Sequence, residues 1–555
     1  MRFNVIGTIF IFALLAGLDA LAQENPAESL RVTADMVDCA EGLIGLEFTP
    51  SETDSMLEYL GDNIEFYDSL RTISIGNEVP PALYFDPIPP GMKFDTAQRQ
   101  IVLSPPEKTA LPRKMKDLAF YSVRDLGELI RTRKISSTEL TKFFIDRLKK
   151  YDSILHCVIT LTEELAYRQA QEADSEIAAG NYRGPLHGIP YGAKDLLAVK
   201  GYKTTWGTPP YREQQIEMNA TVIRKLEEAG AVLVAKLSMG ELAWGDVWFQ
   251  DTTRNPWNVT EGSSGSSAGS ASAVAAGLAP FAIGTETWGS IVSPSTVCGT
   301  TGLRPTYGRV SRYGAMALSW SMDKIGPICR TVEDCAIVFD AIRGPDGFDR
   351  TVIDLSFNYS PESDYKNLRI GYLKEDFDSD STFKKQNNAV LKKLKDLGAE
   401  LIEIKLPNLP IDPMQIILLA ESAAAFDELT RSGQDDQMTR QAMDSWPNVF
   451  RTSRFIPAVE YIQANRLRSL VIEEMSRLFD NIDIYVAPSF EGNNLLLTNL
   501  SGHPCVVLPT GMTKDRDWAS ITFIGRLHDE ATLLAFAGKY QNATGFHLEH
   551  PPKFR

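Results

Sequence analysis

The sequence contains little cysteine, little histidine and no excess of basic residues. Its 555 residues include six cysteines and six histidines, and the formal net charge is −16. Such an acidic chain is poorly suited to bind nucleic acid or an anionic membrane surface. The cysteine spacing matches no metal site, so we expect neither a metal nor a cofactor. We interpret the cysteines as buried thiols with at most one disulfide.

Long apolar runs are also missing, except at the N-terminus. Arg2 is followed by the apolar residues 5–18 and then by Ala20-Leu21-Ala22, a small-x-small cleavage pattern. The run is shorter than the ~20 residues that span a bilayer, so it is typical of a secretory signal peptide rather than of an anchor. We therefore predict a signal peptide over residues 1–22, cleavage near Ala22, export to the periplasm or the exterior, and no stable membrane insertion.

Proline divides the rest of the chain into two parts of different character. Prolines are dense between residues 80 and 112, which excludes long helices and central strands there. We therefore predict that residues 23–118 form an extension with a few helices and a long strap packed on the main body. Residues 119–555 instead alternate helical and strand patterns, beginning with the capping box Ser136-x-x-Glu139. This alternation indicates an α/β domain with a largely buried mixed sheet.

One segment departs from this pattern because it consists almost entirely of glycine, serine and alanine. Residues 262–277 would be typical of a flexible linker if they stood alone. They are followed by the apolar residues 281–283 and by a second small-residue loop, residues 284–294, so the segment lies between core elements. Glycines at such a place allow backbone N–H groups to converge on one point, which suits stabilisation of a developing oxyanion.

Several separated motifs resemble those of the amidase signature family of serine amidohydrolases. They are residues 185–195 (PLHGIPYGAKD), 265–270 (GSSAGS), 284–291 (GTETWGSI), 299–311 (GTTGLRPTYGRVS), 501–504 (SGHP) and 525–534 (GRLHDEATLL). The resemblance implies an α/β fold with a large mixed sheet flanked by helices on both faces. It also implies an amidase, which hydrolyses linear amides and releases ammonia or an amine. The extension lies outside the resemblance.

Within these motifs the resemblance implies three catalytic residues. Lys194 corresponds to the family's catalytic lysine, Ser266 to a bridging serine on a cis peptide bond, and Ser290 to the nucleophile. The lysine must be neutral to accept a proton, and burial lowers the pKa of a lysine because desolvation disfavours the ammonium form. Lys194 would deprotonate Ser266, Ser266 would deprotonate Ser290, and Ser290 would attack the amide carbonyl to form an acyl-enzyme.

The loop that carries the nucleophile is also expected to bind the oxyanion. The donors would be the backbone N–H groups of four consecutive residues, Thr287, Trp288, Gly289 and Ser290. In the other small-residue loop, Gly265 and Ser267 are expected to support the catalytic serines rather than to react. Ser266 and Ser267 are adjacent candidates for the bridging role, and the family pattern selects Ser266.

The sequence departs from the family pattern around the nucleophile. Many members have glycine at the position of Trp288, aspartate at that of Glu286, and arginine at that of Val292. That arginine usually pairs with the acidic residue, so the partner of Glu286 is left open. These changes concern substrate choice rather than the reacting groups. The motif resembles the branch with bacterial peptide amidases more than the glutamine amidase component of transamidation complexes, which an exported chain would not meet.

The substrate is expected to be a small-molecule or peptide amide, acted on by a monomer or homodimer. In the family the specificity pocket is formed partly by loops after the lysine and before the first serine loop. Here these loops contain Met239, Trp244 and Trp206. If they line the pocket, an apolar or aromatic acyl group would be preferred.

Two other interpretations remain open. Residues 265–269 match the G-x-S-x-G nucleophile elbow, in which Ser267 would attack with the help of a later aspartate and His503 or His528. An elbow requires a strand directly before it, whereas residues 255–261 are polar and turn-like. The chain could also be a non-catalytic binding protein with the family's fold, an interpretation that Trp288 beside the nucleophile position favours.

Overall fold

The structure is a computed structural model that describes residues 32–73, 75–362, 367–514 and 517–555. The predicted signal peptide lies outside the described residues. The chain divides into two compact units, residues 1–75 and residues 76–555. The predicted extension spans both units: its helices belong to the first unit, and its proline-rich part belongs to the second.

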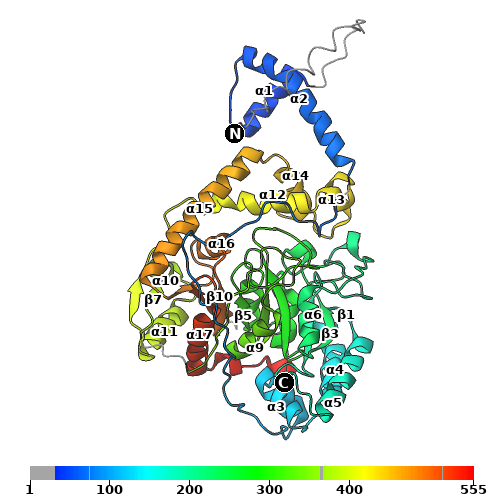
Figure 1. Ribbon diagram of the computed structural model, residues 1–555, viewed down its shortest axis with the longest axis vertical. Helices are drawn as coiled ribbons and strands as arrows, with labels where there is room; N and C mark the ends of the chain where they lie inside the picture. The colour runs from blue at the N-terminus through cyan, green and yellow to red at the C-terminus, as the bar shows by residue number, and fades with distance from the viewer. Residues whose placement is uncertain (1–31, 74, 363–366, 515–516) are drawn as a thin grey trace, which may run out of the picture. The chain divides into compact units, whose positions relative to one another are not determined.

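The described part of the first unit contains two helices, α1 (Ala34–Ile44) and α2 (Pro50–Arg71) (Figure 1). Thr33 caps α1, and Gly45 ends it in the left-handed conformation that glycine adopts without a steric penalty. Thr49 and Glu52 form a capping box at the start of α2. Several large apolar side chains of these two helices are exposed.

The second unit is built on one eleven-stranded sheet with the order β1-β3-β2-β4-β6-β5-β10-β11-β9-β7-β8. The strands are β1 (Val158–Leu161), β2 (Pro190–Lys194), β3 (Val232–Leu237), β4 (Phe281–Glu286), β5 (Thr301–Arg304), β6 (Lys324–Cys329), β7 (Ile370–Tyr372), β8 (Leu401–Glu403), β9 (Ile484–Pro488), β10 (Cys505–Met512) and β11 (Trp518–Gly525). The sheet is mixed: β2 runs parallel to β3 and β4, whereas β4, β6, β5, β10 and β11 pair antiparallel in succession.

The helices of the second unit cover both faces of this sheet. They are α3 (Val123–Arg131), α4 (Ser137–Leu155), α5 (Glu163–Ala178), α6 (Thr221–Glu228), α7 (Ala268–Ala275), α8 (Val292–Cys298), α9 (Val332–Ile342), α10 (Lys374–Ser379), α11 (Lys384–Asp396), α12 (Ile416–Ala425), α13 (Asp427–Arg431), α14 (Trp446–Ser453), α15 (Ala458–Asn481), α16 (Asn494–Leu500) and α17 (Glu530–Thr544). Ile328 of β6 packs with α7 and α8, whereas the next residue, Cys329, packs with α9. Because neighbouring strand residues point to opposite faces, these helices lie on opposite sides of the sheet.

The predicted α/β class with a large, mixed, helix-flanked sheet is therefore confirmed (Figure 1). The capping box predicted at Ser136 and Glu139 is also present and begins α4. All six cysteines are free, and Cys39 alone among them is exposed. Among the described residues, no helix has the length and apolar character needed to cross a membrane.

The topology brings the sequence motifs to one edge of the sheet. Lys194 is the last residue of β2, and Glu286 is the last residue of the adjacent parallel strand β4. Since neighbouring parallel strands end at the same edge, the lysine motif and the loop after β4 meet there. The glycine–serine segment that leads into α7 contacts the same strands, because α7 packs on β2 and β4.

Candidate active site

Lys194 is completely buried, and its amine is surrounded by hydroxyl groups. Its Nζ donates hydrogen bonds to Ser266 Oγ at 2.7 Å, to Thr285 Oγ1 at 2.9 Å and to Ser267 Oγ at 3.2 Å. Burial lowers the pKa of Lys194 from 10.5 to about 7, although the negative charges of Asp323 and Glu286 oppose this shift. A lysine amine at neutral pH is therefore poised between its charged and neutral forms.

The two serines that precede α7 have different surroundings. The peptide bond between Gly265 and Ser266 is cis. Ser267 Oγ donates to the Thr285 carbonyl oxygen at 3.1 Å and accepts from the Thr285 N–H at 3.1 Å. Ser266 Oγ has only the Lys194 amine as a hydrogen-bond partner among the described residues. Ser267 is thus engaged in joining its loop to β4, whereas the hydroxyl of Ser266 is available for proton transfer.

Gly265 is required by close backbone packing. A Cβ atom at this position would lie 1.8 Å from the carbonyl oxygen of Gly245, a distance that no side chain can occupy. The backbone before the cis bond therefore approaches residue 245 more closely than any other amino acid would allow.

Ser290 lies in the loop between β4 and α8. It is partly exposed, and its carbonyl oxygen accepts a hydrogen bond from the Ser267 N–H at 3.2 Å, which joins the two small-residue loops. No hydrogen bond between the Ser266 and Ser290 side chains is present among the described residues. Catalytic hydrogen bonds are often long before substrate binds, so this arrangement is compatible with proton transfer between the two serines.

The same loop presents unused backbone donors. In the hydrogen bonds of the described residues, the N–H groups of residues 287–290 have no acceptor. Gly289 has a φ of 87°, a conformation that glycine adopts readily. The side chain of Trp288 is 40% exposed. The loop therefore combines a partly exposed hydroxyl with free N–H groups, the combination that an oxyanion site requires.

Buried Glu286 holds this loop at its base. Its carboxylate accepts hydrogen bonds from Arg304 at 2.7 Å, from Asn499 Nδ2 at 2.9 Å, and from the N–H groups of Ile291 and Val292 at 2.8 and 2.9 Å. Burial alone would raise the pKa of Glu286, but Arg304 and these donors outweigh it, and the pKa is lowered. The partner that the sequence left open is therefore Arg304 at the end of β5.

A second carboxylate, Asp323, supports the loop from the other side. It accepts from Thr287 Oγ1 at 2.5 Å and from the N–H groups of Leu318 and Ser319 at 2.8 and 3.0 Å. Burial raises the pKa of Asp323, and these hydrogen bonds oppose the shift. Sequence reasoning gave no role to Asp323, Thr285 or Asn499. The arginine could have been found, because residue 304 is the first arginine of the motif at residues 299–311.

A cavity of about 420 Å³ opens beside this site. Thr285, Thr287 and Asp323 line its inner end. Met239, Trp206 and Trp244, which were expected in a substrate pocket, are not among its lining residues. Met239 and Trp206 are buried, with Trp206 packed against Tyr211 and Phe426, and Trp244 packs against Trp446. Their aromatic and apolar character is thus explained by core packing.

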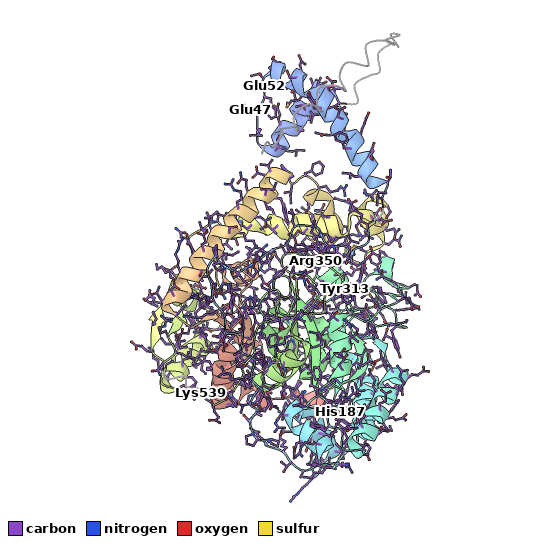
Figure 2. The ribbon with its side chains drawn as sticks, viewed as in Figure 1. Glu47, Glu52, His187, Tyr313, Arg350 and Lys539 are labelled. Atoms are coloured by element: carbon purple, nitrogen blue, oxygen red, sulfur yellow. The ribbon has the colours of Figure 1, made fainter. Side chains whose placement is uncertain are left out.

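Other charged residues near the motifs have structural partners. Asp195 forms a buried ion pair with Lys236 at 2.8 Å and accepts from Thr205. His187 (Figure 2) accepts from the Arg183 N–H through Nδ1, and burial lowers its pKa. Among the described residues, no group of histidine, cysteine and acidic side chains is arranged to hold a metal ion.

The nucleophile-elbow interpretation lacks its structural context. The segment before Ser267 forms only isolated bridges, such as the one between Arg254 and Gly262, and no strand leads into it. Burial lowers the pKa of His503 to about 3 and that of His528 to about 4. His503 shares a hydrogen bond with Ser501 rather than with a serine of the glycine-rich segment.

Comparison with known proteins agrees with this arrangement. The model of the Amidase family matches residues 139–542. One of the subunits of the glutamyl-tRNA(Gln) amidotransferase of Acinetobacter baumannii is 35% identical over 487 residues, which cover 78% of this chain and 98% of that protein. The chain therefore belongs to the amidase family, and it is an enzyme that cleaves amide C–N bonds.

Solved structures give the same result for the fold. The native peptide amidase of Stenotrophomonas maltophilia aligns with a TM-score of 0.69 at 28% identity and covers 76% of this chain and 97% of its own. An amidase family protein of Bacillus anthracis aligns with a TM-score of 0.71 at 26% identity and covers 79% of this chain and 93% of its own. The amidase fold predicted from the motifs is thus confirmed.

Proposed function

We propose that the protein hydrolyses a carboxamide through an acyl-enzyme on Ser290, with Lys194 as the base and Ser266 as the proton relay. The observation that carries this proposal is the environment of Lys194. A fully buried amine with hydroxyl partners and a pKa near 7 can exist in the neutral form, which accepts a proton.

In this mechanism, Ser290 Oγ attacks the amide carbonyl while its proton passes to Ser266, whose own proton passes to the Lys194 amine. The C–O bond forms, and the carbonyl π electrons move to oxygen as an oxyanion. The free N–H groups of Thr287, Trp288, Gly289 and Ser290 are the proposed donors to this oxyanion. As the intermediate collapses, the C–N bond breaks and the proton returns through Ser266 to the leaving ammonia or amine. Water then attacks the acyl-enzyme by the same route and releases the acid.

The hydrogen-bond pattern favours Ser266 over Ser267 as the relay. A neutral amine has two protons to donate and one lone pair to accept with. Ser267 uses its only hydroxyl proton on the Thr285 carbonyl, so it can only accept from Lys194. Ser266 lies closest to Nζ, at 2.7 Å, and has no other acceptor among the described residues.

The proposed substrate is a small-molecule or peptide amide, with nucleic acid not among the partners. The net charge of −16 supports this, because a phosphate backbone would be repelled. All proposed catalytic groups come from one chain, which supports action as a monomer or homodimer. We also propose export after cleavage near Ala22; an N-terminus at Gln23 in protein recovered outside the cytoplasm would support it, and an intact N-terminus would contradict it.

Labelling with a fluorophosphonate, followed by peptide mapping, tests the proposed nucleophile. We expect the label on Ser290, and we expect Ser290→Ala to abolish both labelling and hydrolysis of a panel of carboxamides, anilides and amidated peptides. Ser293→Ala is the matched control, since Ser293 lies in the same loop but its hydroxyl bonds to Ser264. A label on Ser267 would favour the elbow, and an unlabelled, inactive protein would favour the non-catalytic alternative.

A further inference from the structure

The cavity beside the active site has a wall that the family segment does not provide. Residues 77–84 belong to the proline-rich strap, which precedes the matched residues 139–542. The same cavity is lined by Thr285, whose hydroxyl lies 2.9 Å from the Lys194 amine. The strap therefore closes a space that begins at the proposed base. The strap residues that line it are Asn77, Glu78, Pro80, Pro81, Ala82, Leu83 and Tyr84.

The strap is fixed upstream of the cavity by Asn77. Its Nδ2 donates to the Ala317 carbonyl oxygen at 2.8 Å, and its Oδ1 accepts from the Ala317 N–H at 2.7 Å. The same Nδ2 also donates to the Ala425 carbonyl oxygen at 3.3 Å. Ala317 itself lines the cavity, so this paired contact joins the strap directly to another part of the cavity wall.

The strap is fixed again downstream of the cavity. The ring of Phe85 packs edge-on against Tyr307 with 5.0 Å between ring centroids, and the guanidinium of Arg468 lies over it at 3.4 Å. Pro87 is buried. The span between these anchors contains Pro80 and Pro81, whose fixed φ angles limit its freedom. A short, restrained span of this kind is preorganised to contact a ligand.

Apolar side chains of this span are exposed although they line the cavity. Leu83 is 82% exposed and Tyr84 is 49% exposed. On the rim, Tyr313 stacks on Phe348 with 4.4 Å between ring centroids, and Arg350 donates to Tyr84 Oη at 3.5 Å (Tyr313 and Arg350 in Figure 2). A ligand that fills the cavity would remove this apolar surface from water, which favours binding.

From these observations we infer that the strap, through Leu83 and Tyr84, selects amides that carry a long apolar or aromatic arm. The inference rests on the proposed function. A cavity of about 420 Å³ falls within the ~300–1,000 Å³ of small-molecule sites and exceeds the needs of a bare carboxamide. Binding of the arm against the strap places the scissile amide at Ser290. A short amide leaves the strap uncovered and gains nothing from it.

Paired substrates of different length test this inference. Acetamide is compared with 4-phenylbutanamide, whose arm is on the acyl side, and with N-(4-phenylbutyl)acetamide, whose arm is on the amine side. We expect the wild-type enzyme to prefer at least one of the long substrates. We expect Leu83→Ala and Tyr84→Ala each to lower kcat/KM for that substrate by about tenfold, mainly through KM, and to leave acetamide turnover unchanged.

Val79→Ala is the matched control, because Val79 is an exposed strap residue that does not line the cavity. It should leave all three substrates unchanged. The inference is overturned if the wild type shows no preference for length, or if the strap variants change the long and short substrates equally or not at all. Failure of the proposed function is a separate result: a wild-type enzyme that hydrolyses none of the amides and does not react with a fluorophosphonate.

Discussion

Lys194 and Lys236 lie on the neighbouring parallel strands β2 and β3, and both side chains are fully buried, yet their partners differ in charge. Lys236 Nζ contacts the Asp195 carboxylate at 2.8 Å, together with the Lys203 carbonyl oxygen and Thr204 Oγ1 at 2.6 Å. Lys194 contacts three hydroxyls. Burial lowers the pKa of both lysines, but at Lys236 the adjacent Asp195 opposes the shift directly.

The comparison teaches that burial alone does not make a lysine a base. A buried ammonium beside a carboxylate is held in its charged form and orders its surroundings, whereas one beside hydroxyls loses its proton more easily. The sequence places Lys194 and Asp195 next to each other, and the strand alternation points them to different partners. One position therefore serves chemistry while its neighbour serves stability.

The largest effect is expected from removing the unpaired lysine. Lys194→Met should lower kcat by at least about a thousandfold, because the proton of Ser290 then has no base to receive it. Stability at pH 7 should be unchanged or higher, since no ion pair is broken. The folded pKa of about 7 lies below the unfolded 10.5, so the wild type gains stability as pH rises between these values, and the advantage of the variant should shrink there.

Steady-state kinetics and urea unfolding at pH 7 and pH 9 measure both quantities for Lys194→Met. A variant that keeps substantial activity would exclude Lys194 as the base. A variant that is strongly destabilised would mean that Lys194 has a structural role like that of Lys236.

The paired lysine should behave in the opposite way. Lys236→Met leaves the Asp195 carboxylate buried without its partner, so we expect a loss of about 3–5 kcal/mol in the free energy of unfolding. The double variant Lys236→Met/Asp195→Leu removes both charges and should recover part of this loss. Urea unfolding of the two variants checks the prediction; equal destabilisation by the single and the double variant would contradict it.

A smaller effect is expected from the hydroxyl shell of Lys194. Thr285→Val keeps the side-chain shape but removes the hydrogen bond at 2.9 Å from Nζ. We expect kcat to fall by about tenfold and the pKa of Lys194 to fall further, because the ammonium form loses an acceptor. Thr141→Val is the matched control, since Thr141 is buried and its hydroxyl has no hydrogen-bond partner among the described residues. Equal effects of the two variants on the pH–rate profile would contradict this role.

Much of the fold could be predicted because the sequence carries local signals for it. The capping box at Ser136 and Glu139, the alternation of helices and strands, and the separated motifs indicated a mixed, helix-flanked sheet. Strand order could not be predicted, because it depends on pairings between distant segments such as β5 and β10. The division of the extension at residue 75 also has no sequence signal that distinguishes it from the proline-rich region that follows.

The site was less completely predictable than the fold. Lys194, Ser266 and Ser290 could be named because each lies in a short motif. Arg304 and Asn499 support Glu286 through tertiary contacts, and Thr285 and Asp323 reach the site because β4 and β6 pair. The aromatic residues Trp206 and Trp244 were misleading, because composition cannot distinguish a core contact from a pocket wall. The strap was visible only as a run of prolines.

The pH dependence of kcat/KM tests the central claim, that Lys194 is an unpaired base, most directly. With an amide substrate whose own charge does not change, we predict that kcat/KM falls about tenfold per pH unit below an apparent pKa near 7 and is constant above it, because the amine must be neutral. A profile that is flat down to pH 5, or one that continues to rise toward the ordinary lysine pKa of 10.5, would contradict the account.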